Sequence, residues 1–131
     1  MTDVSAAQAS KGMRWASYVA TVLPVLFLLF SASGKFLKPE GMEPNVEHLG
    51  WRMDQMTMLG IVELACVIIY LVPRTAVLGA VLLTAYLGGA TATHARIGDL
   101  FIIPIVTAGL VWLGIFLREP RLWSLLPFRK Y

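Results

Sequence analysis

Charged side chains are scarce in this sequence, and hydrophobic ones are abundant. Only 15% of the residues are charged, whereas 57% are hydrophobic. Soluble domains have about 25% charged and about 45–50% apolar residues, so this composition excludes an ordinary soluble domain and predicts an integral membrane protein. The length of 131 residues allows one transmembrane domain over 1–131 and no second, soluble domain.

Cysteine, histidine and clustered basic residues are also rare, which excludes several kinds of site. The single cysteine, Cys66, lies in an apolar run, so no CxxC pair exists and we expect an inert, buried thiol. The two histidines, His48 and His94, form no HExxH pattern, and we expect no metal site. The net charge of +3 comes from scattered basic residues rather than a basic run, which argues against nucleic acid as a partner.

What the sequence does contain is four apolar runs separated by polar segments. At ~1.5 Å per residue, a helix of about 19 residues spans about 28 Å, close to the ~30 Å hydrocarbon core of a bilayer. The longest polar segment, 34–54, is interpreted as a loop that becomes helical from about Asn45. The sequence therefore predicts an all-α fold, an integral membrane four-helix bundle. Its expected spans are approximately 15–33, 57–72, 76–93 and 101–117.

The distribution of Lys and Arg predicts an orientation for this bundle. With four spans, both termini share one side of the membrane, and that side carries seven of the eleven basic residues. The positive-inside rule then predicts that both termini are cytoplasmic and that loop 34–54 faces outward. A signal peptide is an alternative interpretation of the first run, because Lys11 and Arg14 precede it and 31–33 resembles a cleavage site. The apolar remainder of the chain favours a retained first helix.

Glu63 is the one carboxylate inside the second apolar run. An ionisable group at bilayer depth is costly and usually faces a bundle interior or a wet cavity. Counting residues from the turns places Glu63 level with Thr84 and near Tyr86 and Thr21. No cation is expected at that depth, and desolvation then favours a neutral Glu63. A structural hydrogen bond between helices and a ligand site both remain open as its role.

Two further features of the sequence are a group of polar residues at the outer ends of the predicted spans and a set of small residues in the third span. Lys35, His94, Arg96 and Asp99 gather at the outer end, either as part of a site or as a solvated turn. The third run is rich in Gly and Ala, including Gly88-Gly89. Small residues let membrane helices approach closely, so this run is predicted to be the central packing helix.

Several sequence motifs resemble the DoxX-like family of small bacterial membrane proteins, over about residues 15–127. The resemblance implies four transmembrane helices. It implies no single function, since relatives include subunits of thiosulfate:quinone oxidoreductase, proteins associated with redox stress, maturation factors and receptor chaperones. The positions that match the family pattern are Lys35, Glu63, Arg74, Tyr86 and His94. The motifs that carry the resemblance are 33–37, 60–63, 71–75, 86–94, 112–118 and 121–127.

These observations together predict an accessory subunit of a membrane oxidoreductase system that binds a quinone-like or other apolar molecule. We expect no intrinsic cofactor beyond a bound quinone or lipid. Membrane lipids and another membrane protein, or a second copy, are the expected partners, and a bacterial inner membrane is the expected location. The alternatives are an assembly factor of another complex and an enzyme, such as an isomerase, with Glu63 as acid or base. The predicted ligand-binding residues are Glu63, Tyr86, Thr84, Trp112, Lys35 and His94.

Overall fold

The computed structural model describes residues 11–127, and every regular element in that range is a helix. The prediction of an all-α fold is therefore confirmed. The elements are α1 (Lys11–Leu37), α2 (Met42–His48), α3 (Met53–Leu71), the 3-10 helix η2 (Pro73–Thr75), α4 (Ala76–Arg96), α5 (Ile102–Arg118) and the 3-10 helix η3 (Pro120–Ser124).

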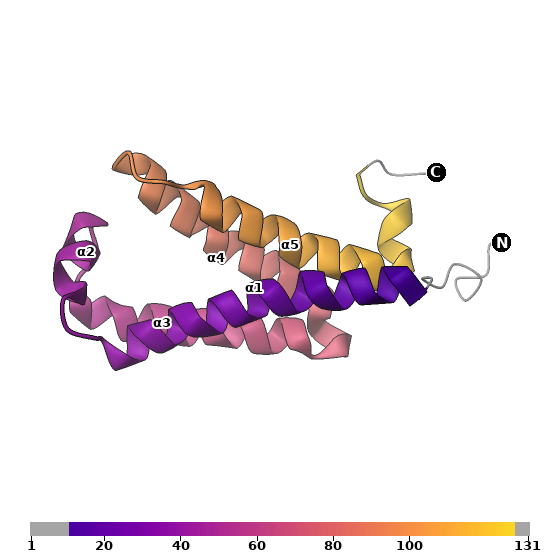
Figure 1. The fold of residues 1–131 in the computed structure, drawn as a ribbon, viewed down its shortest axis with the longest axis horizontal. Helices are drawn as coiled ribbons and strands as arrows, with labels where there is room; N and C mark the ends of the chain where they lie inside the picture. The colour runs from indigo at the N-terminus through magenta and orange to yellow at the C-terminus, as the bar shows by residue number, and fades with distance from the viewer. Residues whose placement is uncertain (1–10, 128–131) are drawn as a thin grey trace.

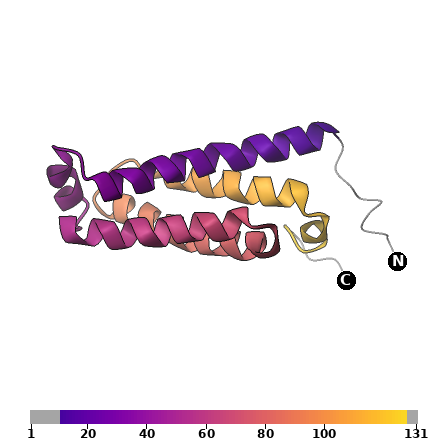
Figure 2. The ribbon, with the colours of Figure 1, turned by 90° about the horizontal axis from the view of Figure 1, so that it is seen from below.

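The four long helices pack as a bundle in which neighbours in sequence are neighbours in space. Helix α1 packs against α3 and α5, and α4 packs against the same two helices from the opposite corner. Figure 1 shows α4 and α5 spreading away from α1 and α3 toward the end at which α2 lies. The start of α1 and η3 lie together at the other end, in both views (Figures 1 and 2). The bundle is thus tight at one end and spread at the other.

Three segments of the described chain are long and apolar enough to cross a membrane: α1, α3 and Pro73–Arg96. Helix α5 is also apolar but has 17 residues, which span about 26 Å. Large apolar side chains project from the bundle, such as Trp15 and Phe30 with exposed fractions of 66% and 77%. An apolar outer surface of this extent is suited to lipid. The chain is an integral membrane protein, while the fourth span and the orientation stay predictions.

The polar segment between the first two apolar runs is more helical than the sequence suggested. Helix α1 continues through Pro24 to Leu37, and Pro39 follows its end. The helical part expected from about Asn45 is the separate helix α2, which begins at Met42. Gly41 and Gly50 flank α2 with φ of +83° and +89°, a left-handed conformation that glycine adopts without strain. The expectation of an irregular loop from Gly34 is wrong for these two stretches.

The tight end of the bundle depends on Gly79, one of the small residues of the third apolar run. A Cβ atom at Gly79 would fall on the backbone of Tyr70, so α4 approaches α3 there as closely as two helices can. The side chain of Tyr70 is fully buried, and its hydroxyl donates to the carbonyl oxygen of Val111 at 2.8 Å. By contrast, a Cβ at Gly88 or Gly89 would meet no atom within 4 Å. The expected packing role of Gly88-Gly89 is therefore wrong within this chain.

Candidate ligand-binding site around Glu63

Glu63 lies on the inner face of α3, in the spread half of the bundle, and only 1% of its surface is exposed. Three side chains from two other helices reach one of its oxygens, Oε2. Lys35 Nζ lies 2.8 Å from this atom, the Tyr86 hydroxyl 3.1 Å and the Ser31 hydroxyl 3.5 Å. A buried carboxylate is stable only when it is paired and hydrogen-bonded in this way.

The expectation that no cation lies at the depth of Glu63 is wrong, because Lys35 forms an ion pair with it. Lys35 belongs to the last turn of α1, beyond the apolar run. Side chains on a helix point back toward its N-terminus, so the long Lys35 stem lies over the preceding turn. There its ammonium group donates to Ser31 Oγ at 2.7 Å as well as to Glu63. Only 17% of the Lys35 side chain is exposed, so the pair is largely shielded.

Tyr86 joins this pair from α4, as the depth of its position suggested. Its hydroxyl donates to Glu63 Oε2 at 3.1 Å. Lys35 Nζ also lies 6.0 Å from the centre of the Tyr86 ring, at the outer limit of a cation–π contact. Helices α1, α3 and α4 therefore meet at a single carboxylate oxygen, although α1 and α4 are diagonal in the bundle.

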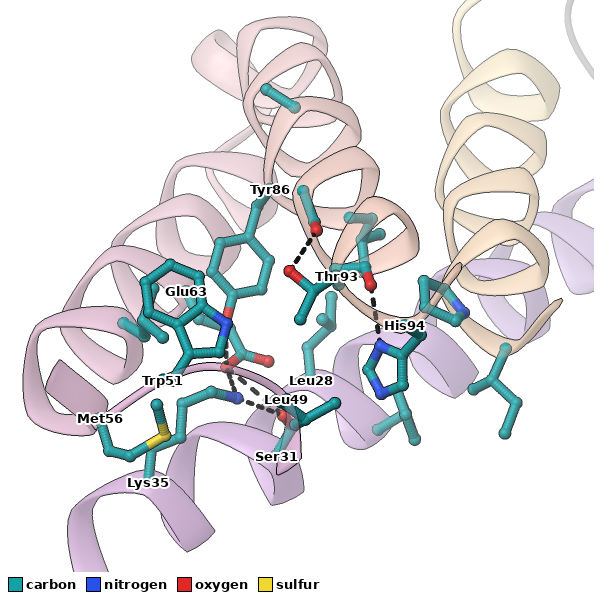
Figure 3. Close-up of a pocket in the computed structure, with 18 of the residues that line it drawn as sticks. Leu28, Ser31, Lys35, Leu49, Trp51, Met56, Glu63, Tyr86, Thr93 and His94 are labelled. Atoms are coloured by element: carbon teal, nitrogen blue, oxygen red, sulfur yellow. Dashed lines mark hydrogen bonds and ion pairs between the residues drawn. The ribbon is translucent and has the colours of Figure 1, made fainter. Parts of the chain in front are cut away.

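The cluster borders a cavity of about 470 Å³ in the spread end of the bundle (Figure 3). Cavities of about 300–1,000 Å³ with apolar walls and a few polar groups are typical of small-molecule sites. Apart from its polar residues, the wall consists of apolar side chains and one glycine, from all four long helices and the segments beside α2 and α5. The polar residues that line it are Ser31, Lys35, Glu63, Tyr86, Thr93 and His94.

A short segment that includes the end of α2 is bound to the turn between α4 and α5 at this end of the bundle. Arg96 Nη2 donates to the Leu49 carbonyl oxygen at 2.8 Å, and His48 Nε2 lies 3.3 Å from Asp99 Oδ1. Leu49 and Trp51, from the same segment, line the cavity. The polar residues expected at the outer end therefore have different contacts. His94 borders the cavity, whereas Arg96 and Asp99 bind the segment that covers part of the cavity.

Two of the predicted site residues lie away from Glu63. The indole N–H of Trp112 donates to the hydroxyl of Thr84, which itself donates to the Ala80 carbonyl oxygen, and neither residue lines the cavity. Thr21, another expected partner, is buried near Gly114 with no hydrogen-bond partner in the described chain. The depth count was sound, but the rotation of each helix about its axis decides which side chains meet. Arg74 lies in η2 and also does not line the cavity.

Ser31 is the member of the cluster that sequence reasoning missed as a site residue. The signal was available, since Ser31 precedes Lys35 by four residues and such positions are adjacent on one face of a helix. Elsewhere in residues 11–127, no group of three His, Cys, Asp or Glu side chains is placed to hold a metal ion. The polar side chains that a ligand in the cavity can meet are therefore the ion pair, three hydroxyl groups and an imidazole.

One comparison with known proteins identifies a family for this chain. The sequence model of the DoxX-like family matches residues 19–116, which include Glu63, Lys35, Tyr86 and His94. No curated protein and no solved structure matches the chain. The match covers most of the chain, and the resemblance of its motifs is confirmed. The protein belongs to the DoxX-like family.

Proposed function

We propose that this protein binds a lipid-soluble molecule, of the quinone type or similarly apolar with one polar group, in the cavity beside Glu63. In this proposal it acts as an accessory subunit of a membrane oxidoreductase system. One observation carries the proposal: the buried Lys35–Glu63 pair forms part of the wall of a 470 Å³ apolar cavity. The accessory role draws on the family resemblance, and with one cysteine the chain has no dithiol of its own to carry electrons.

The position of the ion pair supports a binding role over a purely structural one. Removing two charges from water costs several kcal/mol per ion, and apolar side chains of similar volume often stabilise a fold as well or better. A pair that served only to join α1 and α3 would gain from complete enclosure by side chains. Here the pair borders open space large enough for a small molecule. Its polar atoms are therefore available to orient a ligand that enters from the apolar surroundings.

The proposal includes a topology. Helices α1, α3, α4 and α5 each cross the membrane of a bacterial cell, both termini are cytoplasmic, and the cavity lies in the outward half. Seven of the eleven basic residues then lie on the cytoplasmic side, which supports this orientation. Cysteine substitutions at Lys38 and Lys11, labelled from outside by a membrane-impermeant maleimide, test it, and labelling at position 11 alone would contradict it.

The binding role is tested by native mass spectrometry of the protein purified gently in nanodiscs. Gly89 lines the cavity and has open space where a side chain would begin, so Gly89→Leu fills the cavity without a clash at Cβ. Gly88 has the same open space but does not line the cavity, so Gly88→Leu is the matched control. We expect a small molecule to be retained by the wild type and by Gly88→Leu but lost from Gly89→Leu. Retention by both variants would contradict the proposal.

A second candidate function, assembly of another membrane complex, is favoured by one face of α4. Gly88, Ala92 and Ala95 are exposed at a spacing that places them on one side of the helix, where small residues let a partner helix approach closely. If this face binds a partner, Gly88→Leu removes the partner from a gentle purification while the small molecule stays. The same two variants therefore separate the two functions.

A further inference from the structure

We infer that the ligand of this cavity carries a hydroxyl group, as a phenol, a quinol or an alcohol does, and that this group donates a hydrogen bond to Glu63 Oε1. The inference rests on the proposed binding function and specifies the chemical class of the ligand. It follows from which polar atoms of the cluster are already used within the protein and which remain available to a molecule in the cavity.

The two oxygens of Glu63 are used unequally. Lys35, Tyr86 and Ser31 all reach Oε2, and no described residue donates to Oε1. Among the described side chains that are not exposed, Thr21 Oγ1 is the one nitrogen or oxygen atom that is shielded from open space and also lacks a hydrogen-bond partner. Glu63 Oε1 also lacks a hydrogen-bond partner, and it is not among the shielded atoms. It must therefore be in contact with open space, and the space beside Glu63 is the cavity. Figure 3 shows the hydrogen bonds converging on one carboxylate oxygen while the other points away from Lys35.

The other polar groups on the wall add to this excess of acceptors. His94 Nδ1 lies 2.8 Å from the Ala90 carbonyl oxygen, which can only accept, so Nδ1 carries the proton. In the neutral imidazole, Nε2 is then an acceptor. The Tyr86 hydroxyl donates to Glu63 and keeps its own lone pairs. Against these acceptors stand two donors: the third N–H of Lys35, whose other two contacts are Ser31 and Glu63, and the indole N–H of Trp51 on the cavity wall.

These free atoms discriminate between classes of ligand. A molecule with only carbonyl or ether oxygens can use the Lys35 donor but leaves Glu63 Oε1 without a partner. A buried charged acceptor without a donor is costly, so such a molecule is disfavoured. A carboxylate or phosphate would bring a second negative charge to Glu63. A hydroxyl group both donates and accepts, so it satisfies Oε1 and remains compatible with Lys35.

The test uses two probes, 4-nonylphenol and its methyl ether 4-nonylanisole, in which a methyl group replaces the hydroxyl hydrogen. Binding of each is measured by native mass spectrometry in nanodiscs, with protein-free nanodiscs as the reference for partition into lipid. We expect the phenol to bind the wild type at least about tenfold more tightly than the ether. The double variant Lys35→Met with Glu63→Met removes both charges together, and it should bind the two probes equally.

The outcomes separate this inference from the proposed function. Equal binding of the two probes to the wild type, lost in Gly89→Leu but not in Gly88→Leu, would overturn the hydroxyl inference and leave the cavity as a ligand site. The absence of specific binding by either probe would overturn the inference. A preference for the phenol that persists at full size in the double variant would show that the hydroxyl bonds elsewhere, which also contradicts the assignment to Glu63.

Discussion

Lys35 Nζ lies 2.8 Å from Glu63 Oε2, and this contact joins the last turn of α1 to the middle of α3. Ser31 on α1 and Tyr86 on α4 bond to the same carboxylate oxygen. Because this cluster of side chains borders the cavity, a ligand in the cavity should change the free energy of the ion pair.

The first prediction concerns the coupling of the two charges. Lys35→Met leaves Glu63 buried without its cation, and breaking a buried pair in this way costs roughly 3–5 kcal/mol. The double variant Lys35→Met with Glu63→Met removes both charges, so we expect it to be within about 1–2 kcal/mol of the wild type. Unfolding in mixed detergent, followed by circular dichroism, measures the wild type, the single variants Lys35→Met and Glu63→Met, and the double variant. Losses that simply add in the double variant would contradict a direct ion pair.

The second prediction concerns the contact between α3 and α4 at the tight end. A methyl group at Gly79 would fall on the backbone of Tyr70, which cannot move aside as a flexible side chain can. We expect Gly79→Ala to destabilise the protein by about 1–3 kcal/mol, as overpacking does. Gly88→Ala has open space and is the control, with no loss and a small gain in helix propensity. Thermal unfolding measures the stability of both variants. Equal stability of Gly79→Ala and Gly88→Ala would refute the close approach of α3 and α4.

The third prediction concerns the segment that covers part of the cavity. Arg96 donates to the Leu49 carbonyl oxygen, so Arg96→Ala removes a contact that holds this segment to α4. A hydrogen bond contributes about 0.5–1.5 kcal/mol, which corresponds to roughly two- to tenfold faster exchange through local opening. Hydrogen exchange at the amides of 49–51 measures this, with Arg74→Ala at the opposite end as control. Unchanged exchange in Arg96→Ala would show that other contacts hold the segment.

The fourth prediction is a pH dependence outside the membrane spans. The Arg121 guanidinium donates to Glu119 at 2.7 Å and holds the pKa of that carboxyl below its usual value. A carboxyl whose pKa is lowered by folding stabilises the fold above its unfolded pKa, and this contribution is lost as the pH falls through the folded pKa. We expect Arg121→Gln to raise the Glu119 pKa in an NMR titration. The effect on stability should be small because the pair is near the surface.

The sequence was sufficient to predict the helices and the burial of Glu63, because apolar runs and an isolated carboxylate are local features. It also placed Tyr86 at the right depth, since depth follows from residue count along adjacent helices. Depth alone could not separate Tyr86 from Thr84, which is two residues away but hydrogen-bonded to Trp112 on α5. That distinction depends on the rotation of α4 about its axis, which packing against Tyr70 at Gly79 helps to fix.

Lys35 shows a different limit of sequence reasoning. Its position beyond the apolar run suggested a residue at the membrane surface. Two facts reverse this: α1 continues through it to Leu37, and a lysine side chain is long enough to lie over the preceding turn. Neither is visible from hydropathy, which describes segments rather than side-chain directions. The cavity wall likewise depends on the segment that follows α2, because Leu49 and Trp51 line the cavity and Arg96 at the end of α4 donates to the Leu49 carbonyl oxygen.

The most direct test of a ligand site beside Glu63 is the quenching of Trp51 fluorescence by a bromine-labelled 4-nonylphenol, an apolar phenol whose bromine atom quenches tryptophan emission. Trp51 lines the cavity, and replacing the three other tryptophans, Trp15, Trp112 and Trp123, with Phe makes it the sole emitter. The account predicts saturable quenching that survives Gly88→Leu and disappears in Gly89→Leu. Quenching that rises linearly with the concentration of this phenol, and equally in all three proteins, would contradict it.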